Sequence, residues 1–138
     1  MGAPQAIDSP TAAEAAGVAD FRVALRRFQR QTEIVARECG ITPSWYMLLL
    51  QIKGAPDLSE RTTVTELARR LQLAQSSVTE LVARAEKAGL IRRTLSTEDA
   101  RVVHLQLSDD GEQTFARAFR DLAAEREALR EAIADLEA

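Results

Sequence analysis

A short run of polar side chains near the middle of the chain carries the chemistry that this sequence offers. Amide and hydroxyl groups, which bind base edges and phosphates, occur at Gln75, Ser76, Ser77 and Thr79. The run follows the helical segment Leu67–Leu71 after a turn of three or four residues. That spacing lets a second helix project into the major groove of DNA. On spacing alone, a plain helical hairpin fits equally well.

Residue types that support catalysis or metal binding are scarce. His104 is the single histidine, and we interpret it as a surface residue on the outer face of a strand. Cys39 falls on an apolar helical stripe, which favours a packed, inert thiol over a redox sensor. Asp109 and Asp110 suit the first turn of a helix that Ser108 can cap, which is a better interpretation than acid/base catalysis. We therefore expect no enzyme activity, no metal site and no cofactor.

The charge of the chain is unevenly distributed. The net charge of −3 over 138 residues argues against a nucleic-acid partner when it is taken as a whole. Residues 61–104, however, hold eight basic and five acidic side chains, whereas residues 105–138 hold four basic and nine acidic ones. A basic middle between acidic ends is the distribution that local binding to a polyanion produces, although many proteins show a similar asymmetry.

The length and hydropathy of the chain exclude other classes of protein. A chain of 138 residues suits one domain with a real core. No stretch approaches the roughly 20 apolar residues that a membrane span requires. The N-terminus lacks the basic and apolar regions of a signal peptide. We expect a soluble, cytoplasmic protein with no membrane partner.

The segment from residue 41 to residue 107 has the pattern of a winged helix-turn-helix. Thr42-Pro43 is a helix start, and Thr63 with Glu66 has the spacing of a capping box. After residue 89 the hydrophobic period changes from helical to alternating, which predicts a strand at residues 102–107 paired with Ile91–Leu95. The predicted fold class is mainly α, with a small β-hairpin as the wing.

Two long apolar stripes flank this segment. The first runs at alternating steps of three and four residues from Val18 to Cys39, and the second runs likewise from Phe115 to Leu136, interrupted by Arg126. We interpret Arg126 as a break between two helices. Stripes of this length favour N- and C-terminal dimerisation helices, at residues 18–40 and 108–138, shared with a second copy of the chain. Packing of both helices on their own domain remains the alternative. Residues 1–17 are expected to form a disordered tail.

Four pieces of this sequence, in order and at matching spacing, resemble the multiple antibiotic resistance regulator (MarR) family of bacterial transcription factors. They are Ile41–Trp45, Val64–Ala68 with Leu71, Gly89–Arg93 followed by Asp99-Ala100-Arg101, and Leu107-Ser108 with Gly111. The resemblance covers roughly residues 41–111. It implies a single MarR-like domain over residues 18–138, with the winged helix-turn-helix at 41–107.

The resemblance also implies roles for individual side chains. Positions that read the groove would be taken by Gln75, Ser76, Ser77 and Thr79. Arg84 would lie further along the recognition helix near the DNA backbone, and Arg92 and Arg93 would belong to the DNA-binding wing. Arg101 would enter the minor groove from the wing tip and Asp99 would hold it, because a guanidinium is favoured there and a carboxylate fixes its orientation.

Three residues depart from the family pattern. Ala74 replaces the usual capping serine, so that Ser76 or water is expected to bind the first amides of the recognition helix. Glu80 replaces a residue that is commonly basic and brings negative charge close to phosphate. Ala85 replaces a usual leucine and leaves a smaller contact with the core.

The family resemblance implies a ligand-responsive, homodimeric repressor that binds double-stranded DNA at a pseudo-palindromic operator. A small aromatic or anionic effector would bind near Phe28, Gln31, Trp45 and Tyr46. A winged-helix module that binds protein without specific DNA binding is the main alternative, because the basic patch is weak and Glu80 is acidic.

Overall fold

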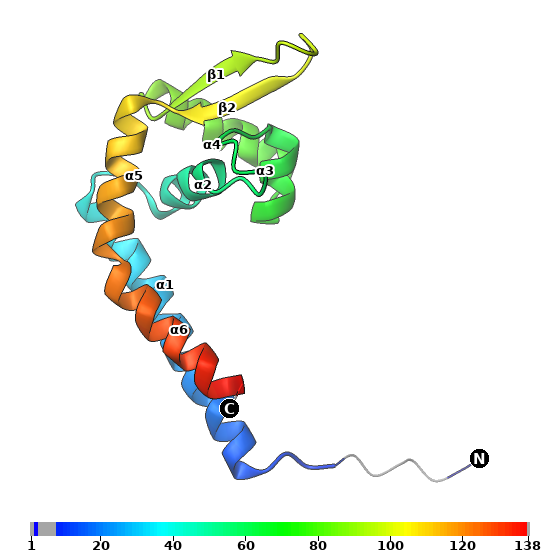
Figure 1. Cartoon of the computed structure of the whole chain (residues 1–138), viewed down its shortest axis with the longest axis vertical. Helices are drawn as coiled ribbons and strands as arrows, with labels where there is room; N and C mark the ends of the chain where they lie inside the picture. Colours follow the sequence, from blue (N-terminus) through cyan, green and yellow to red (C-terminus); the bar gives the residue numbers. More distant parts are fainter. Residues whose placement is uncertain (1, 3–7, 138) are drawn as a thin grey trace. The chain divides into compact units, whose positions relative to one another are not determined.

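The computed structural model describes residue 2 and residues 8–137. The fold is mainly helical with one antiparallel hairpin, which confirms the predicted fold class (Figure 1). In chain order the elements are α1 (Ala12–Glu38), α2 (Pro43–Lys53), α3 (Val64–Leu71), α4 (Gln75–Lys87), β1 (Ile91–Leu95), β2 (Val103–Leu107), α5 (Asp109–Asp121) and α6 (Ala123–Glu137). Among the described residues, no helix combines the length and the apolar character that crossing a bilayer requires.

The chain divides into two compact units, and the single MarR-like domain expected over residues 18–138 stays a prediction. The winged unit is Thr32–Leu122, and the outer unit comprises the described residues before 32 and after 122. The predicted boundaries followed residues 40 and 107. The bounds of the compact units differ from these, because the last turns of α1 and all of α5 belong to the winged unit, where Val35 and Phe115 are buried in its core.

The core of the winged unit is made by apolar faces of its helices and of the hairpin. Leu48, Leu49 and Ile52 of α2 are fully buried, as the helical spacing predicts. The ring of Tyr46 stacks on Phe115 of α5, with centroids 5.8 Å apart. At the edge of this core, Lys53 of α2 forms ion pairs with Glu60 and Glu112, which connect α2 to the following loop and to α5.

Three predicted helix starts are confirmed by their capping hydrogen bonds. The hydroxyl of Thr42 accepts from the amide of Trp45 at 3.1 Å, and Pro43 follows as the first helical residue. The hydroxyls of Thr63 and Ser108 accept in the same way from the amides three residues later, at 3.2 and 3.0 Å. Such caps satisfy amides that have no partner within the helix. The helices of the winged unit are therefore set largely by local sequence.

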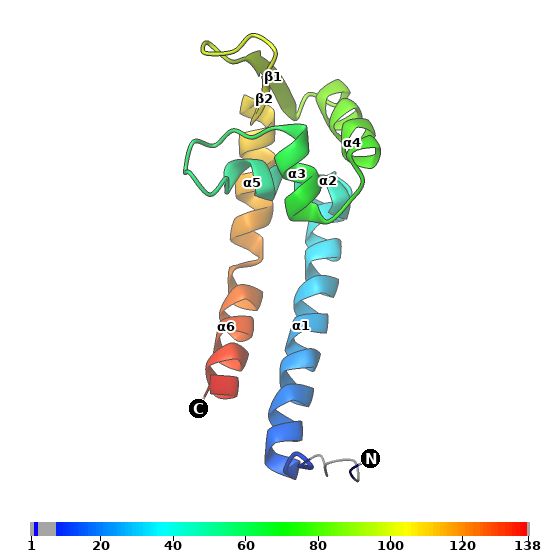
Figure 2. The same ribbon diagram turned by 90° about the vertical axis from the view of Figure 1, so that its right-hand side faces the viewer.

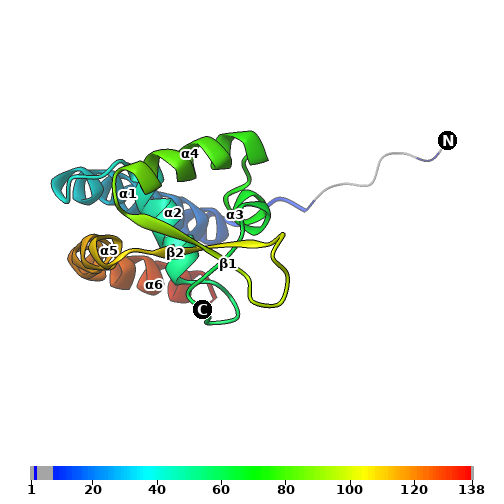
Figure 3. The same ribbon diagram turned by 90° about the horizontal axis from the view of Figure 1, so that it is seen from above.

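The hairpin pairs Ile91 with Leu107 at its base and Leu95 with Val103 at its tip. Its apolar residues alternate as predicted, since Leu105 and Leu107 are buried. A contact that the sequence did not predict joins Thr62 to Leu105 through two backbone hydrogen bonds of 3.1 and 2.7 Å. Viewed from above, the loop of the hairpin extends past α3 (Figure 3).

The outer unit differs from the sequence prediction at two points. The helix α1 begins at Ala12, where the predicted tail extended to residue 17, because alanines favour helix and the hydroxyl of Thr11 accepts from the amide of Glu14. Residues 1 and 3–7 of that tail lie outside the described residues. The break in the second stripe occurs at Leu122, four residues before Arg126, which lies within α6. Within this unit, α1 and α6 run in opposite chain directions (Figure 2).

Candidate nucleic-acid interface

The helix α4 presents a polar face to solvent and an apolar face to the core. Val78, Val82 and Ala85 are fully buried at helical spacing, so α4 is oriented in a fixed way against the core. The polar residues on the other face are all exposed, namely Gln75, Ser76, Ser77 and Thr79. This arrangement leaves the predicted groove-reading side chains available to a partner.

The start of α4 is held by a side chain of α3. The amide group of Gln75 donates a hydrogen bond of 2.7 Å to the hydroxyl of Thr65. Gln72, the last residue before the turn, has a left-handed conformation with φ of 57°. The cap residue Ala74 makes no side-chain hydrogen bond to the first amides of α4. Those amides therefore remain at the exposed end of the helix, where its dipole is positive.

Further along α4, two acidic residues bind basic ones. Arg84 donates from Nη2 to Oε1 of Glu80 at 2.5 Å, one helical turn earlier. Arg93 of β1 donates from Nε to both carboxylate oxygens of Glu86, at 3.0 and 3.1 Å. Arg92, its neighbour on β1, is exposed and pairs in register with Gln106. Two of the three arginines named on this surface, Arg84 and Arg93, are thus bound to carboxylates of the same chain.

The tip of the wing is organised around Asp99. Its carboxylate accepts from the backbone amide of Arg101 at 3.0 Å and from the guanidinium at 3.1 and 3.3 Å. These bonds from Arg101 hold the pKa of Asp99 below its ordinary value, since they favour the ionised form. Ser96 accepts from the amides of Glu98 and Asp99 and closes the loop. The side chain of Arg101 is 92% exposed, so the loop presents an oriented cation to solvent.

Comparisons with known proteins decide the family. A family model described as MarR family matches residues 40–102. The HTH-type transcriptional repressor MdtR of Bacillus subtilis is 37% identical over 76 residues, which cover 55% of this chain and 46% of that protein. Sco3205, a MarR family transcriptional regulator from Streptomyces coelicolor solved in complex with DNA, is similar with a TM-score of 0.62. It is 25% identical, and the match covers 96% of this chain and 80% of that one.

The chain belongs to the MarR family. The YusO protein of Bacillus subtilis has a similar structure, with a TM-score of 0.58 at 27% identity over 88% of this chain and 82% of that one. The curated MarR relatives are named as transcriptional regulators, not as enzymes. The matches to them span between 34% and 66% of their own lengths.

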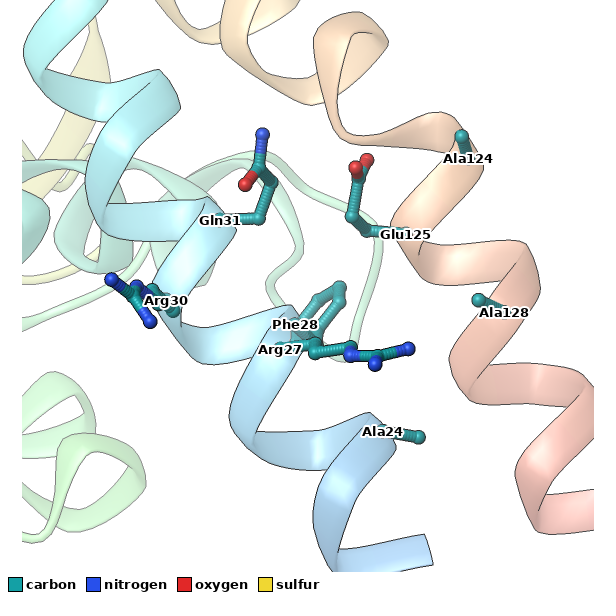
Figure 4. A pocket seen from close by; sticks show the side chains of 8 residues that line it. All are labelled: Ala24, Arg27, Phe28, Arg30, Gln31, Ala124, Glu125 and Ala128. Atoms are coloured by element: carbon teal, nitrogen blue, oxygen red, sulfur yellow. The ribbon is translucent and has the colours of Figure 1, made fainter. Parts of the chain in front are cut away.

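The four residues predicted to surround an effector divide between the two units. Phe28 and Gln31 line a hollow of about 340 Å³ in the outer unit, between α1 and α6. Arg27 and Glu125 also line it, and Gln31 and Glu125 extend toward each other across the space (Figure 4). The remainder of the wall is formed by the small apolar side chains of Ala24, Ala124 and Ala128 and by a second cation, Arg30.

The other two effector candidates belong to the winged unit of this MarR-family chain. Tyr46 is buried at 4% exposure against Phe115, so it serves the core. Trp45 is half-buried and packs at the edge of the same core. Their positions in α2 explain the core role, because the apolar face of this short helix has to fill the centre of the unit.

His104 is not the plain surface residue that the alternation predicted. It is half-buried, and its Nδ1 is shielded from solvent without a hydrogen-bond partner among the described atoms. The bridge between Thr62 and Leu105 brings the loop before α3 against this side of β2, where His104 lines a hollow with Asp57 and Glu66. For Cys39, also half-buried, burial raises the pKa of the thiol, which lowers its thiolate fraction.

Sequence reasoning missed Thr65 and Glu86, which position Gln75 and Arg93. Glu86 and Arg93 are separated by a turn, at Gly89 with φ of 81°, and no local pattern connects residues on either side of it. One feature of the sequence could have indicated Thr65. It lies in the first turn of α3, and α4 begins at Gln75, shortly after α3 ends. Both contacts depend on how two elements meet.

Proposed function

We propose that this chain is a DNA-binding transcriptional regulator of the MarR family, acting in the cytoplasm as a homodimer. The observation that carries the proposal is the combination of an exposed polar face on α4 with an oriented guanidinium at the wing tip. The first matches hydrogen-bonding groups in the major groove, and the second matches the negative potential of a narrow minor groove. Bases or phosphates would be contacted by Gln75, Ser76, Ser77 and Thr79. The DNA backbone would be contacted by Arg84, Arg92 and Arg93. Arg101, held by Asp99, would enter the minor groove.

The outer unit supports the homodimer. None of the α6 side chains described, from Ala123 to Leu136, is buried, although Leu129, Ile133 and Leu136 form an apolar stripe along the helix. A second copy of the same unit covers such stripes with a self-complementary surface. Two recognition helices related by this symmetry would meet a pseudo-palindrome whose half-sites are about 34 Å apart.

Repression and control by a ligand complete the proposal. MdtR, the relative with 37% identity, is named as a repressor. The hollow beside Phe28 and Gln31 has an aromatic wall and, in Arg27, a cation, which suits a small aromatic anion. An effector there would change DNA binding by favouring one arrangement of the outer helices.

The test is binding to duplex DNA from upstream of the chain's own gene, measured across salt concentration. A regulator that contacts phosphates loses affinity steeply as salt rises, because counterions are released on binding. Arg101→Ala should weaken binding, whereas Arg130→Ala on α6 serves as the matched control. Equal binding by Arg101→Ala and the parent would remove the wing from the interface. Absence of salt-dependent binding to any duplex would favour the module that binds protein.

A further inference from the structure

The arginines of the helix-turn-helix and wing are mostly bound to carboxylates of the same chain. Ion pairs connect Arg69 with Glu66, Arg84 with Glu80, Arg93 with Glu86, and Arg101 with Asp99. By contrast, α1 carries five exposed arginines that form no ion pair with a carboxylate among the described residues, namely Arg22, Arg26, Arg27, Arg30 and Arg37. Pairing is thus concentrated on the surface that we assign to DNA.

In two of these pairs, those of Asp99 and Glu66, the carboxylate residue also has a place in the local fold. Asp99 also accepts from a backbone amide and shapes the wing loop, and Glu66 lies at the capped start of α3. Glu80 and Glu86 lie in the middle and last turns of α4, and Glu80 has 64% of its side chain exposed. The one polar contact described for the carboxylate of Glu80 is with Arg84, and the one described for the carboxylate of Glu86 is with Arg93.

A carboxylate on a guanidinium occupies the donors that a phosphate would use. Arginine binds both groups through the same planar set of N–H donors. In Arg93, the Nε–H is shared between both oxygens of Glu86, and in Arg84 the Nη2 is taken by Glu80 at 2.5 Å. A DNA phosphate that binds these same donors has to displace the carboxylate, which then remains near the DNA as an unpaired negative charge.

We propose that Glu80 and Glu86 are specificity-determining residues that compete with DNA phosphates for Arg84 and Arg93. The inference rests on the proposed function. Competition lowers the affinity for every duplex, since phosphate contacts supply nonspecific binding. Base contacts of the polar residues at the start of α4 are unaffected by it. Glu80 also remains able to accept from the N4 amino group of a cytosine, so that a correct site recovers part of the loss.

The experiment uses Glu80→Gln and Glu86→Gln, singly and together, in the full chain. These changes keep the shape of the side chain and remove its charge. Each variant is titrated with a random-sequence duplex of about 30 base pairs, long enough for two half-sites, and with the duplex from upstream of its own gene. Fluorescence anisotropy gives the affinity at several salt concentrations, and circular dichroism checks that each variant is folded.

We expect each substitution to raise affinity for the random duplex by about two- to fivefold, the range set by one exposed ion pair. Affinity for the upstream duplex should rise less, so that the ratio between the two falls. The slope of log affinity against log salt should steepen by up to about 0.9 for each arginine that gains a phosphate. Glu127→Gln is the matched control, because it removes the same charge from an ion pair with Arg130 in α6.

A double-mutant cycle separates competition from simple repulsion. If Glu80 acts by occupying Arg84, the gain from Glu80→Gln disappears in an Arg84→Ala background, and the gain from Glu86→Gln disappears in Arg93→Ala. If the gains persist unchanged, the carboxylates repel phosphate directly and the inference is overturned while the proposed function stands. Binding by the double glutamine variant where the parent binds nothing would support the competition. Binding by neither would overturn both proposals.

Discussion

The two units of the chain bury their apolar side chains to very different degrees. Every side chain that the structure describes as buried lies between residues 32 and 122, in the winged unit. In the outer unit, Val18, Val23 and Ile133 are about half exposed, at 52%, 52% and 42%. The winged unit therefore has its own hydrophobic core, whereas the outer helices have apolar surface without a core. The core of the winged unit can therefore stabilise that unit alone, whereas the outer unit needs a partner surface to cover its apolar side chains.

A pair of amphipathic helices gains little stability in water unless their apolar faces are covered. We expect the winged unit to be stabilised by burial of its own apolar side chains. We expect the outer unit to be stabilised by burial of its apolar faces against a second copy. Substitutions in the two units should therefore differ in how their effects depend on protein concentration.

The largest effect is expected from Leu49→Ala in α2. Leu49 is fully buried, so its truncation leaves a cavity and should lower the free energy of unfolding by about 2–5 kcal/mol. Denaturant unfolding followed by circular dichroism measures this value. The loss should be the same at low and high protein concentration, and a loss that varies with concentration would show that the winged core also depends on the partner.

The next effect is expected from Ile133→Asp in α6. If a second copy covers this stripe, the lost burial of about 1.5–3 kcal/mol per large apolar side chain and the added charge weaken the dimer by at least about tenfold. Sedimentation at micromolar concentration measures the dissociation. Ala134→Asp, at an exposed neighbouring position, is the matched control. A stable monomer in the parent protein would contradict the homodimer.

A third prediction concerns the junction between the hairpin and α5. A Cβ at Gly111 would lie 2.0 Å from the carbonyl oxygen of Leu90, which is backbone and unable to rotate away. Gly111→Ala should cost about 1–3 kcal/mol of stability, as overpacking does. Gln113→Ala, exposed in the same helix, is the control for thermal unfolding. An unchanged melting temperature for Gly111→Ala would mean that α5 shifts freely on the hairpin.

The smallest effect is expected at the wing tip. Arg101 lowers the pKa of Asp99, so the pair is intact above the ordinary pKa of an aspartate, about 3.9, and is lost only as pH falls through the lower value in the folded protein. An NMR titration of the Arg101 amide should therefore show no transition between pH 5 and 8. Asp99→Asn should alter the amide shift without changing global stability, since the pair lies at the tip of the wing, with Arg101 exposed and Asp99 half-buried.

The winged unit was largely predictable from the sequence because its signals are local. Caps at Thr42, Thr63 and Ser108 and the alternation in the wing each depend on a few neighbouring residues, and each is confirmed. The break near Arg126 was misplaced because a polar residue in an apolar stripe resembles a helix end. The break at Leu122 follows instead from the tertiary burial of that side chain, at 1% exposure.

The candidate interface was predictable in part. The family resemblance indicated which side chains of α4 and the wing would be exposed, and the pairing of Asp99 with Arg101 is as predicted. The contacts of Gln75 with Thr65 and of Arg93 with Glu86 were not predicted, because each joins two elements whose approach is set by the core. The roles of these residues toward DNA remain predictions.

The two backbone hydrogen bonds between Thr62 and Leu105 have a mechanical consequence. They fix the middle of β2 to the residue that precedes the cap of α3, while the loop from Ser96 to Val102 is closed by hydrogen bonds within the loop. The wing is thus attached to the segment before α3 at the middle of β2, whereas its loop is closed by bonds within the loop. We expect a displacement of Arg101 to reach the start of α3 along β2, through these two backbone bonds and the buried residue Leu105.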